Sequence, residues 1–198
     1  MPIISGGLPC IVEASPFSII DIVCRMISRP LFQSPLTQRI ADFLVDIGIE
    51  IRSGNITGDT FLPGIQVNSG GLLADEALMT YPGDLLHEAG HLAVVSPERR
   101  RGLHTHVGDD PAEEMMAIAW SYAAAVHLEI DPAVLFHSGG YKGGGEGLVE
   151  SFTGGRTFGV PMLAWIGLTA DGARARELGV PPYPHMIHWV LEGNPGEV

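Results

Sequence analysis

The stretch that decides the fold runs from Tyr81 to Pro97 and reads YPGDLLHEAGHLAVVSP. It contains two histidines four positions apart, His87 and His91, with Glu88 directly after the first. If the stretch is helical, both imidazoles lie one turn apart on one face, where they can bind the same cation. Glu88 then lies beside the pair, close enough to reach a water at the metal but badly placed to ligate. This is the HExxH pattern, and we expect a metal site here.

Local signals predict a helix over this stretch. Pro82 suits a first helical turn, where a missing N–H is harmless, and Asp84 places negative charge at the positive end of the helix dipole. Leucines and alanines at helical intervals give the helix a face to bury. Gly90 weakens a helix by about 1 kcal/mol relative to alanine, so we interpret it as a point of close approach to another backbone. Pro97 is expected to end the helix, with Arg99–Arg101 at its negative end.

A catalytic zinc usually has three protein ligands, so a third ligand must come from outside this helix. Asp110-Pro111 predicts the start of a second helix that reaches about Leu128 and has Glu113 and Glu114 in its first turn. Glu113 occupies a position that caps its own helix, whereas Glu114 shares a side with small residues that allow close helix packing. We therefore expect Glu114 to be the ligand. The rivals are Glu113, His104, His106, His127 and His137.

Three short extended segments precede the histidine helix and are separated by turn residues: Ile49–Ile51, Phe61–Val67 and Leu72–Asp75. They predict a small three-stranded sheet packed on the HExxH helix. Its edge strand is expected to cover the core or to bind an extended peptide by strand addition. The predicted fold class is α+β, mainly helical.

Helices and loops are predicted on both sides of this centre, in a single domain over residues 1–198 with its core at about 36–130. Residues 98–110 and the glycine-rich residues 138–147 are expected to be loops, the second of them flexible. The part after residue 130 is expected to be irregular and rich in glycine and proline. Helices are predicted at 15–30, 35–47, from Asp131-Pro132, at 148–152 and at 161–168, and a terminal apolar element at 185–191.

Composition limits the function classes. The formal net charge is −12, which argues against nucleic acid or an anionic membrane as a partner. No apolar run approaches the roughly 20 residues that span a bilayer, and the N-terminus has no signal-peptide pattern. Cys10 and Cys24 form neither a disulfide framework nor a CxxC pair, so we expect both to be reduced. The expected compartment is the cytoplasm, and the oligomeric state is not predicted.

The two motifs together resemble a known group of enzymes. HEAGH, followed by Glu114-x-x-Ala117-x-x-Trp120-Ser121, is similar to the zincin metallopeptidases of the gluzincin type, especially the small minigluzincins. The resemblance covers roughly residues 49–126. It implies a zincin-like fold, Zn²⁺ held by His87, His91 and Glu114, and Glu88 as general base and proton shuttle.

The expected reaction is hydrolysis of an amide or peptide bond in a peptide or protein substrate by a metal-activated water. Tyr141 is the preferred oxyanion donor, because its glycine-rich loop could close over a site; His137, His104 and His106 are alternatives. In a competing hypothesis the metal is structural or regulatory, in a protein that hydrolyses nothing. A metal-free helical domain with a chance motif is the third. Glu88 favours catalysis, because a structural site has no need of an acid there.

Overall fold

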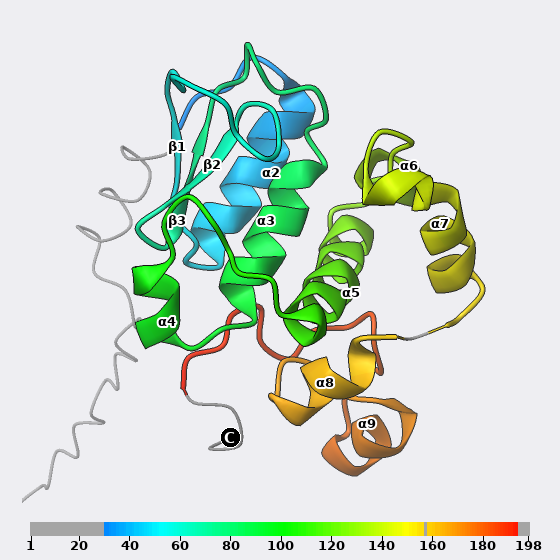
Figure 1. Cartoon of the computed structure of the whole chain (residues 1–198). Coiled ribbons are helices and arrows are strands. Elements are labelled where there is room, and N and C mark those ends of the chain that lie inside the picture. Colours follow the sequence, from blue (N-terminus) through cyan, green and yellow to red (C-terminus); the bar gives the residue numbers. More distant parts are fainter. Residues whose placement is uncertain (1–29, 157, 194–198) are drawn as a thin grey trace, which may run out of the picture.

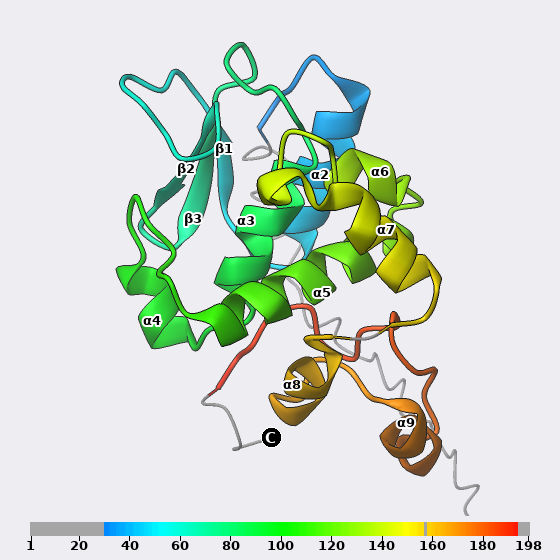
Figure 2. The same cartoon turned by 45° about the vertical axis from the view of Figure 1, so that its right-hand side comes forward.

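The computed structural model describes residues 30–156 and 158–193, which form an α+β fold (Figure 1). A small sheet lies on one side of the molecule, with α2 and α3 beside it and α5 beyond them, and Figure 2 shows the same order after a turn. Residues 15–29 of the first expected helix and both cysteines lie outside the described residues. The helical elements are α2 (Pro35–Asp46), α3 (Asp84–Ala93), α4 (Pro97–Gly102), α5 (Pro111–His127), α6 (Pro132–Leu135), the 3-10 turn η1 (Tyr141–Gly143), α7 (Gly145–Thr153), α8 (Val160–Trp165) and α9 (Gly172–Leu178).

The predicted three-stranded sheet is confirmed, and it packs on α3. Its strands are β1 (Ile51–Ser53), β2 (Ile65–Asn68) and β3 (Gly71–Ala74), in the order β1-β3-β2. β1 runs parallel to β3, whereas β2 pairs antiparallel with β3 through a two-residue turn. The side chains of Ile65 and Val67 are buried, and α3 contacts both β2 and β3. As a consequence β2 is an edge strand next to the histidine helix.

Helices α3 and α5 pack closely against each other at the glycine of the HEAGH motif. A Cβ built on Gly90 would lie 2.8 Å from the backbone oxygen of Ala117 and 3.1 Å from its Cα. The buried face of α5 is largely alanine around Trp120, which is completely buried. The interpretation of Gly90 as a point of close backbone approach is confirmed. This contact sets the distance between the helix with the histidines and the helix with the acidic pair.

Gly90→Ala is expected to destabilise the protein, because the methyl group would press on the backbone of α5 and push the two helices apart. We expect a loss of about 1–3 kcal/mol in the free energy of unfolding, measured by urea denaturation. Gly147→Ala in α7 is the matched control, since a Cβ there meets nothing within 4 Å. It should gain up to about 1 kcal/mol from helix propensity. Equal effects of the two substitutions would contradict close packing at Gly90.

The region after the histidine helix differs from the prediction. α3 begins at Asp84, after Pro82, and ends at Ala93, four residues before Pro97. Pro97 instead starts α4, because Ser96 caps the helix: its hydroxyl accepts a hydrogen bond from the N–H of Arg99. The expected loop at 98–110 is therefore helical over its first residues. The arginine run lies at the end of α4 rather than at the end of α3.

The glycine-rich segment also differs from the prediction, because residues 138–147 hold η1 and the first turn of α7. Tertiary packing explains the regular structure: a Cβ on Gly145 would clash with the backbone oxygen of Phe136, and the Phe136 and Phe152 rings stack. Glycine here permits close backbone packing as well as turns. The expectation that this segment is a loop without regular structure is wrong.

The C-terminal part is more helical than expected. α7 covers the predicted helix at 148–152, and α8 covers most of the one at 161–168. α9 was not predicted, although Asp171 before it and Gly179 after it are ordinary helix start and stop residues. Residues 185–191 are neither helix nor strand, but Leu191 donates its N–H to the Ala93 carbonyl at the end of α3. None of the helices in the described part of the chain has the length and apolarity to cross a membrane.

Candidate metal centre

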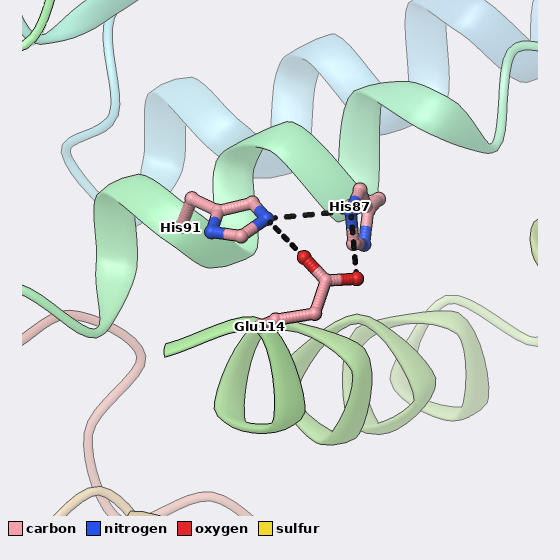
Figure 3. A group of neighbouring side chains, drawn as sticks. All are labelled: His87, His91 and Glu114. Atoms are coloured by element: carbon pink, nitrogen blue, oxygen red, sulfur yellow. Dashed lines mark hydrogen bonds and ion pairs between the residues drawn. The ribbon is translucent and has the colours of Figure 1, made fainter. Parts of the chain in front are cut away.

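Three predicted ligands meet in the space between α3 and α5. Nε2 of His87 lies 3.3 Å from Nε2 of His91, and the carboxylate of Glu114 faces both from α5 (Figure 3). Its Oε1 is 3.7 Å from Nε2 of His87, and its Oε2 is 3.2 Å from Nε2 of His91. Among the residues that the structure describes, this is the group of donors that could hold a metal ion. The helical spacing of HExxH therefore places the two imidazoles side by side, as predicted.

The separations of these donors fit a small tetrahedral cation. A zinc ion has nitrogen and oxygen ligands at about 2.0–2.2 Å, so two tetrahedral ligands should lie about 3.3–3.6 Å apart. The observed distances of 3.2 to 3.7 Å agree with this spacing. Two imidazoles and one carboxylate are also a donor set that zinc accepts in catalytic sites, where the fourth position stays open. The residues thus fit a zinc ion, although geometry alone leaves the identity of the metal unassigned.

The alternative acidic ligand, Glu113, is held elsewhere. It is buried, and its carboxylate forms a two-pronged ion pair with the guanidinium of Arg99, with 2.7 Å between Nη2 and Oε2. This ion pair connects Arg99 of α4 to the first turn of α5, directly beside Glu114. Asp110 caps the N-terminus of α5, because its carboxylate accepts a hydrogen bond from the N–H of Ala112. The structure thus brings Glu114, rather than Glu113, to the histidines.

The other candidate histidines lie away from the three donors. His104 and His106 are exposed, and His106 lines the same cavity as Glu88. His127, at the end of α5, packs against the rings of Phe43 and Trp189. None of the three belongs to the donor group found in the described residues.

Glu88 is buried next to the donors, and its environment favours the protonated form. It is 8% exposed, and burial raises the pKa of its carboxyl above the usual range. The electrostatic interaction with His91 opposes this shift, while the negative charges of Asp84 and Glu114 add to it. A carboxyl with a raised pKa is a stronger base than an exposed carboxylate, which suits a group that accepts and returns a proton. Glu88 also lines a cavity of about 280 Å³ beside β2, so it faces open space.

The side chain of His87 is 12% exposed, and its partial burial lowers its affinity for a proton. Burial, together with the charge of His91, lowers the pKa of His87 to about 4, while the charge of Glu114 acts in the opposite direction. A neutral imidazole is the form that binds a metal ion.

The metal-free protein is expected to lose stability as the pH falls from about 6.5 towards 4. In that window the unfolded state binds a proton on His87 that the folded state excludes, so stability is complete above the unfolded pKa and declines below it. The slope due to this group approaches about 1.4 kcal/mol per pH unit. The check is urea denaturation in EDTA for wild type and His87→Gln. If the two stabilities changed in parallel with pH, the effect would not come from His87.

Tyr141 lies against one of the three donors, His87. Its ring packs edge-on to His87 with 5.5 Å between ring centroids, and its hydroxyl is buried without a hydrogen-bond partner among the described residues. Burial and the nearby charges of Asp84, Glu114 and Glu88 raise the pKa of the Tyr141 phenol. It therefore keeps its proton and can donate a hydrogen bond. Its backbone has a φ of 52°, in the left-handed region that is uncommon for residues other than glycine.

A buried pair that sequence reasoning missed lies behind this tyrosine. Nε2 of His137 is 2.8 Å from Oδ1 of Asp84, and the His137 ring stacks on Tyr81 at 3.5 Å between centroids. A Cβ on Gly139 would clash with the Tyr81 ring, so the loop lies directly on it. The pair joins the start of α3 to the segment that carries Tyr141. The Nε2 of His137 contacts Asp84 and its Nδ1 is buried without a partner among the described residues, whereas the ring of Tyr141 lies directly against His87. Asp84 was read only as a helix-dipole residue.

Comparisons of the chain with protein-family models, with curated proteins and with solved structures found no match. The similarity to gluzincins therefore rests on the residues of the two helices and on the geometry described above.

Proposed function

We propose that the protein is a zinc-dependent hydrolase with a zincin-like fold that cleaves a peptide or amide bond. The observation that supports this most is the convergence of two histidines of α3 and Glu114 of α5 at zinc-ligand spacing, with a buried acid next to them. Zinc bound there would supply a Lewis acid that polarises a carbonyl and lowers the pKa of a water to about 7.

Glu88 is the proton carrier in this proposal. It takes a proton from the attacking water as the water oxygen bonds to the carbonyl carbon. It then gives this proton to the nitrogen as the carbon–nitrogen bond breaks, so the carboxylate is restored. Its raised pKa and its position on the cavity wall support both roles. A purely structural site would have no use for a buried acid facing a cavity.

Tyr141 is the proposed donor to the negative charge that develops on the carbonyl oxygen. A neutral, buried phenol without a protein partner has its hydrogen bond available for a ligand. The Asp84–His137 pair holds the loop that carries it, so this donor is positioned before the substrate binds.

Tyr141→Phe is expected to lower kcat by about 100- to 1,000-fold while zinc content stays at that of wild type. The control is Tyr183→Phe, which also removes a buried hydroxyl, one that donates to the Ala119 carbonyl at 2.9 Å. That variant should lose stability and keep kcat. An unchanged kcat in Tyr141→Phe would remove this residue from the proposed chemistry.

The test of the proposed function has two parts. Zinc in protein purified without added metal is measured by elemental analysis, and a mixed-sequence peptide library is scanned for cleavage by mass spectrometry. The proposal expects about one zinc per chain and cleavage that EDTA abolishes. Zinc without any cleavage would favour the competing function, a metal-binding or regulatory protein. Absence of zinc, with a melting temperature that EDTA leaves unchanged, would contradict both functions.

A further inference from the structure

Residues 59–62, the loop that leads into β2, form part of the wall of the cavity of about 280 Å³ beside that strand. Local contacts hold the loop in place. The hydroxyl of Thr60 donates to the Leu62 carbonyl at 2.7 Å. A Cβ on Gly64 would clash with the backbone of Met79, so the turn after the loop lies directly on that segment. The loop therefore presents its side chains to the cavity in a fixed arrangement.

Two side chains of this loop bring an aromatic ring and a negative charge to the cavity. Phe61 is 92% exposed and lines the cavity, whereas the next residue, Leu62, packs against the core. Asp59 lines the same cavity, is exposed, and forms no ion pair or side-chain hydrogen bond within residues 30–156 and 158–193. A carboxylate and a ring face are the two groups that bind a cationic side chain, the first through charge and the second through a cation–π contact.

The charges around the cavity also favour a cation. Among the described residues that line it, none is lysine or arginine, and Glu88 adds a second carboxyl to the wall. His106 lines it too, but its Nδ1 accepts a hydrogen bond from the N–H of Gly108 at 2.9 Å, which requires a neutral ring. A cleft with carboxyl groups, in a chain of net charge −12, concentrates cationic ligands.

We infer that this cavity selects substrates with an arginine or lysine side chain next to the bond that is cleaved. The charged end of that side chain pairs with Asp59, and the side chain lies on the ring of Phe61. Glu88, the proposed proton carrier, lines the same cavity, so the residue held there is close to the scissile bond. Apolar side chains leave Asp59 unused, and acidic ones are repelled by it. This inference rests on the proposed function, because that function makes the cavity a substrate site.

The test on the ligand side measures binding without turnover, in zinc-loaded Glu88→Gln protein. The probes are heptapeptide pools with a fixed central residue, which is arginine, lysine, norleucine or glutamate, between randomised uncharged neighbours. An exposed ion pair and an exposed cation–π contact each contribute about 2- to 5-fold in affinity, so the arginine and lysine pools should bind about 5- to 25-fold more tightly than the norleucine pool. The glutamate pool should bind most weakly.

The test on the protein side begins with the charge of Asp59, in the same Glu88→Gln background. Asp59→Asn should lower the affinity for the arginine pool by about 2- to 5-fold and leave the affinity for the norleucine pool unchanged. Asp59→Lys should reverse the preference, so that the glutamate pool binds more tightly than the arginine pool. Glu98→Gln makes the same change in charge as Asp59→Asn on an exposed residue outside the cavity, and it should change neither affinity. Equal effects of these two substitutions would overturn the inference.

Phe61→Ala tests the aromatic ring, and Trp165→Ala is its matched control. Trp165 is an exposed residue of α8 that does not line the cavity, so both substitutions remove an exposed ring. Phe61→Ala should lower the affinity for the arginine pool by about 2- to 5-fold, whereas Trp165→Ala should leave it unchanged. An unchanged affinity in Phe61→Ala would contradict the inference.

The outcomes separate this inference from the proposed function. Equal binding of the four pools, tightest binding of the norleucine pool or the absence of any binding would overturn the inference. Cleavage by wild-type protein without a preference for arginine or lysine would also overturn it, and would leave the proposed hydrolysis standing. Selective binding of the arginine and lysine pools, with no cleavage by wild-type protein, would support the inference and contradict the proposed hydrolysis.

Discussion

Glu88→Gln is expected to abolish hydrolysis while zinc binding persists. Glutamine has nearly the same shape but cannot accept and return a proton, so the fall in kcat should be about 100- to 10,000-fold, the usual contribution of general acid–base catalysis. The zinc content should equal that of wild type, because Glu88 is not among the donors. Removing a buried acid should also leave stability unchanged or raised, since the carboxyl is buried at a cost in solvation.

The measurement is a comparison of kcat and bound zinc for wild type, Glu88→Gln and Glu98→Gln. Glu98 is an exposed residue of α4, so its substitution makes the same change in charge without touching the site. Glu98→Gln is expected to behave as wild type. Activity retained in Glu88→Gln would mean that another group carries the proton, whereas loss of zinc would mean that Glu88 is needed to build the site.

Glu114→Gln should lose zinc, and its neighbour Glu113→Gln should keep it. The Glu114 carboxylate faces both histidines, and their hydrogen bonding and charge lower its pKa, so it is an anion at neutral pH. Zinc at a free concentration 1,000 times its Kd stabilises the folded state by about 4 kcal/mol. For a chain of this length that corresponds to about 8 to 16 °C in Tm. The variant should therefore melt at the temperature of EDTA-treated wild type.

Glu113→Gln tests whether zinc binding needs the carboxylate of Glu114 in particular or any carboxylate in the first turn of α5. Its ion pair with Arg99 is lost in the variant, so its stability should fall, but added zinc should still raise the Tm. Tm is measured by thermal unfolding with zinc and with EDTA for wild type and both variants. The ligand assignment would be wrong if Glu113→Gln lost the response to zinc and Glu114→Gln kept it.

Local sequence signals predicted the structure correctly where the prediction depended on residues of one helix only. Helical spacing placed His87 and His91 on one face, and the Asp110-Pro111 start set the register of α5 closely enough to favour Glu114. They were less reliable where two signals overlap: Pro97 was expected to end a helix and instead begins the next one, capped by Ser96. Proline fits both positions, so only the surrounding chain decides.

Long-range contacts explain the features that the sequence did not predict. The order of the glycine-rich segment depends on Phe136 and Phe152, and the Asp84–His137 pair joins residues 53 positions apart. The ion pair of Arg99 with Glu113 needs α4 beside α5. No local pattern contains these partners, because each exists only when elements distant in the chain are packed together.

By itself the sequence determined that two imidazoles share a helix face with an acid beside them, since this follows from the helical repeat alone. It also favoured Glu114 over its neighbour Glu113 as the third ligand, with four histidines as further candidates. Only the tertiary structure decided between them, because the close packing of α3 on α5 at Gly90 brings Glu114 to the histidines while Arg99 holds Glu113 aside.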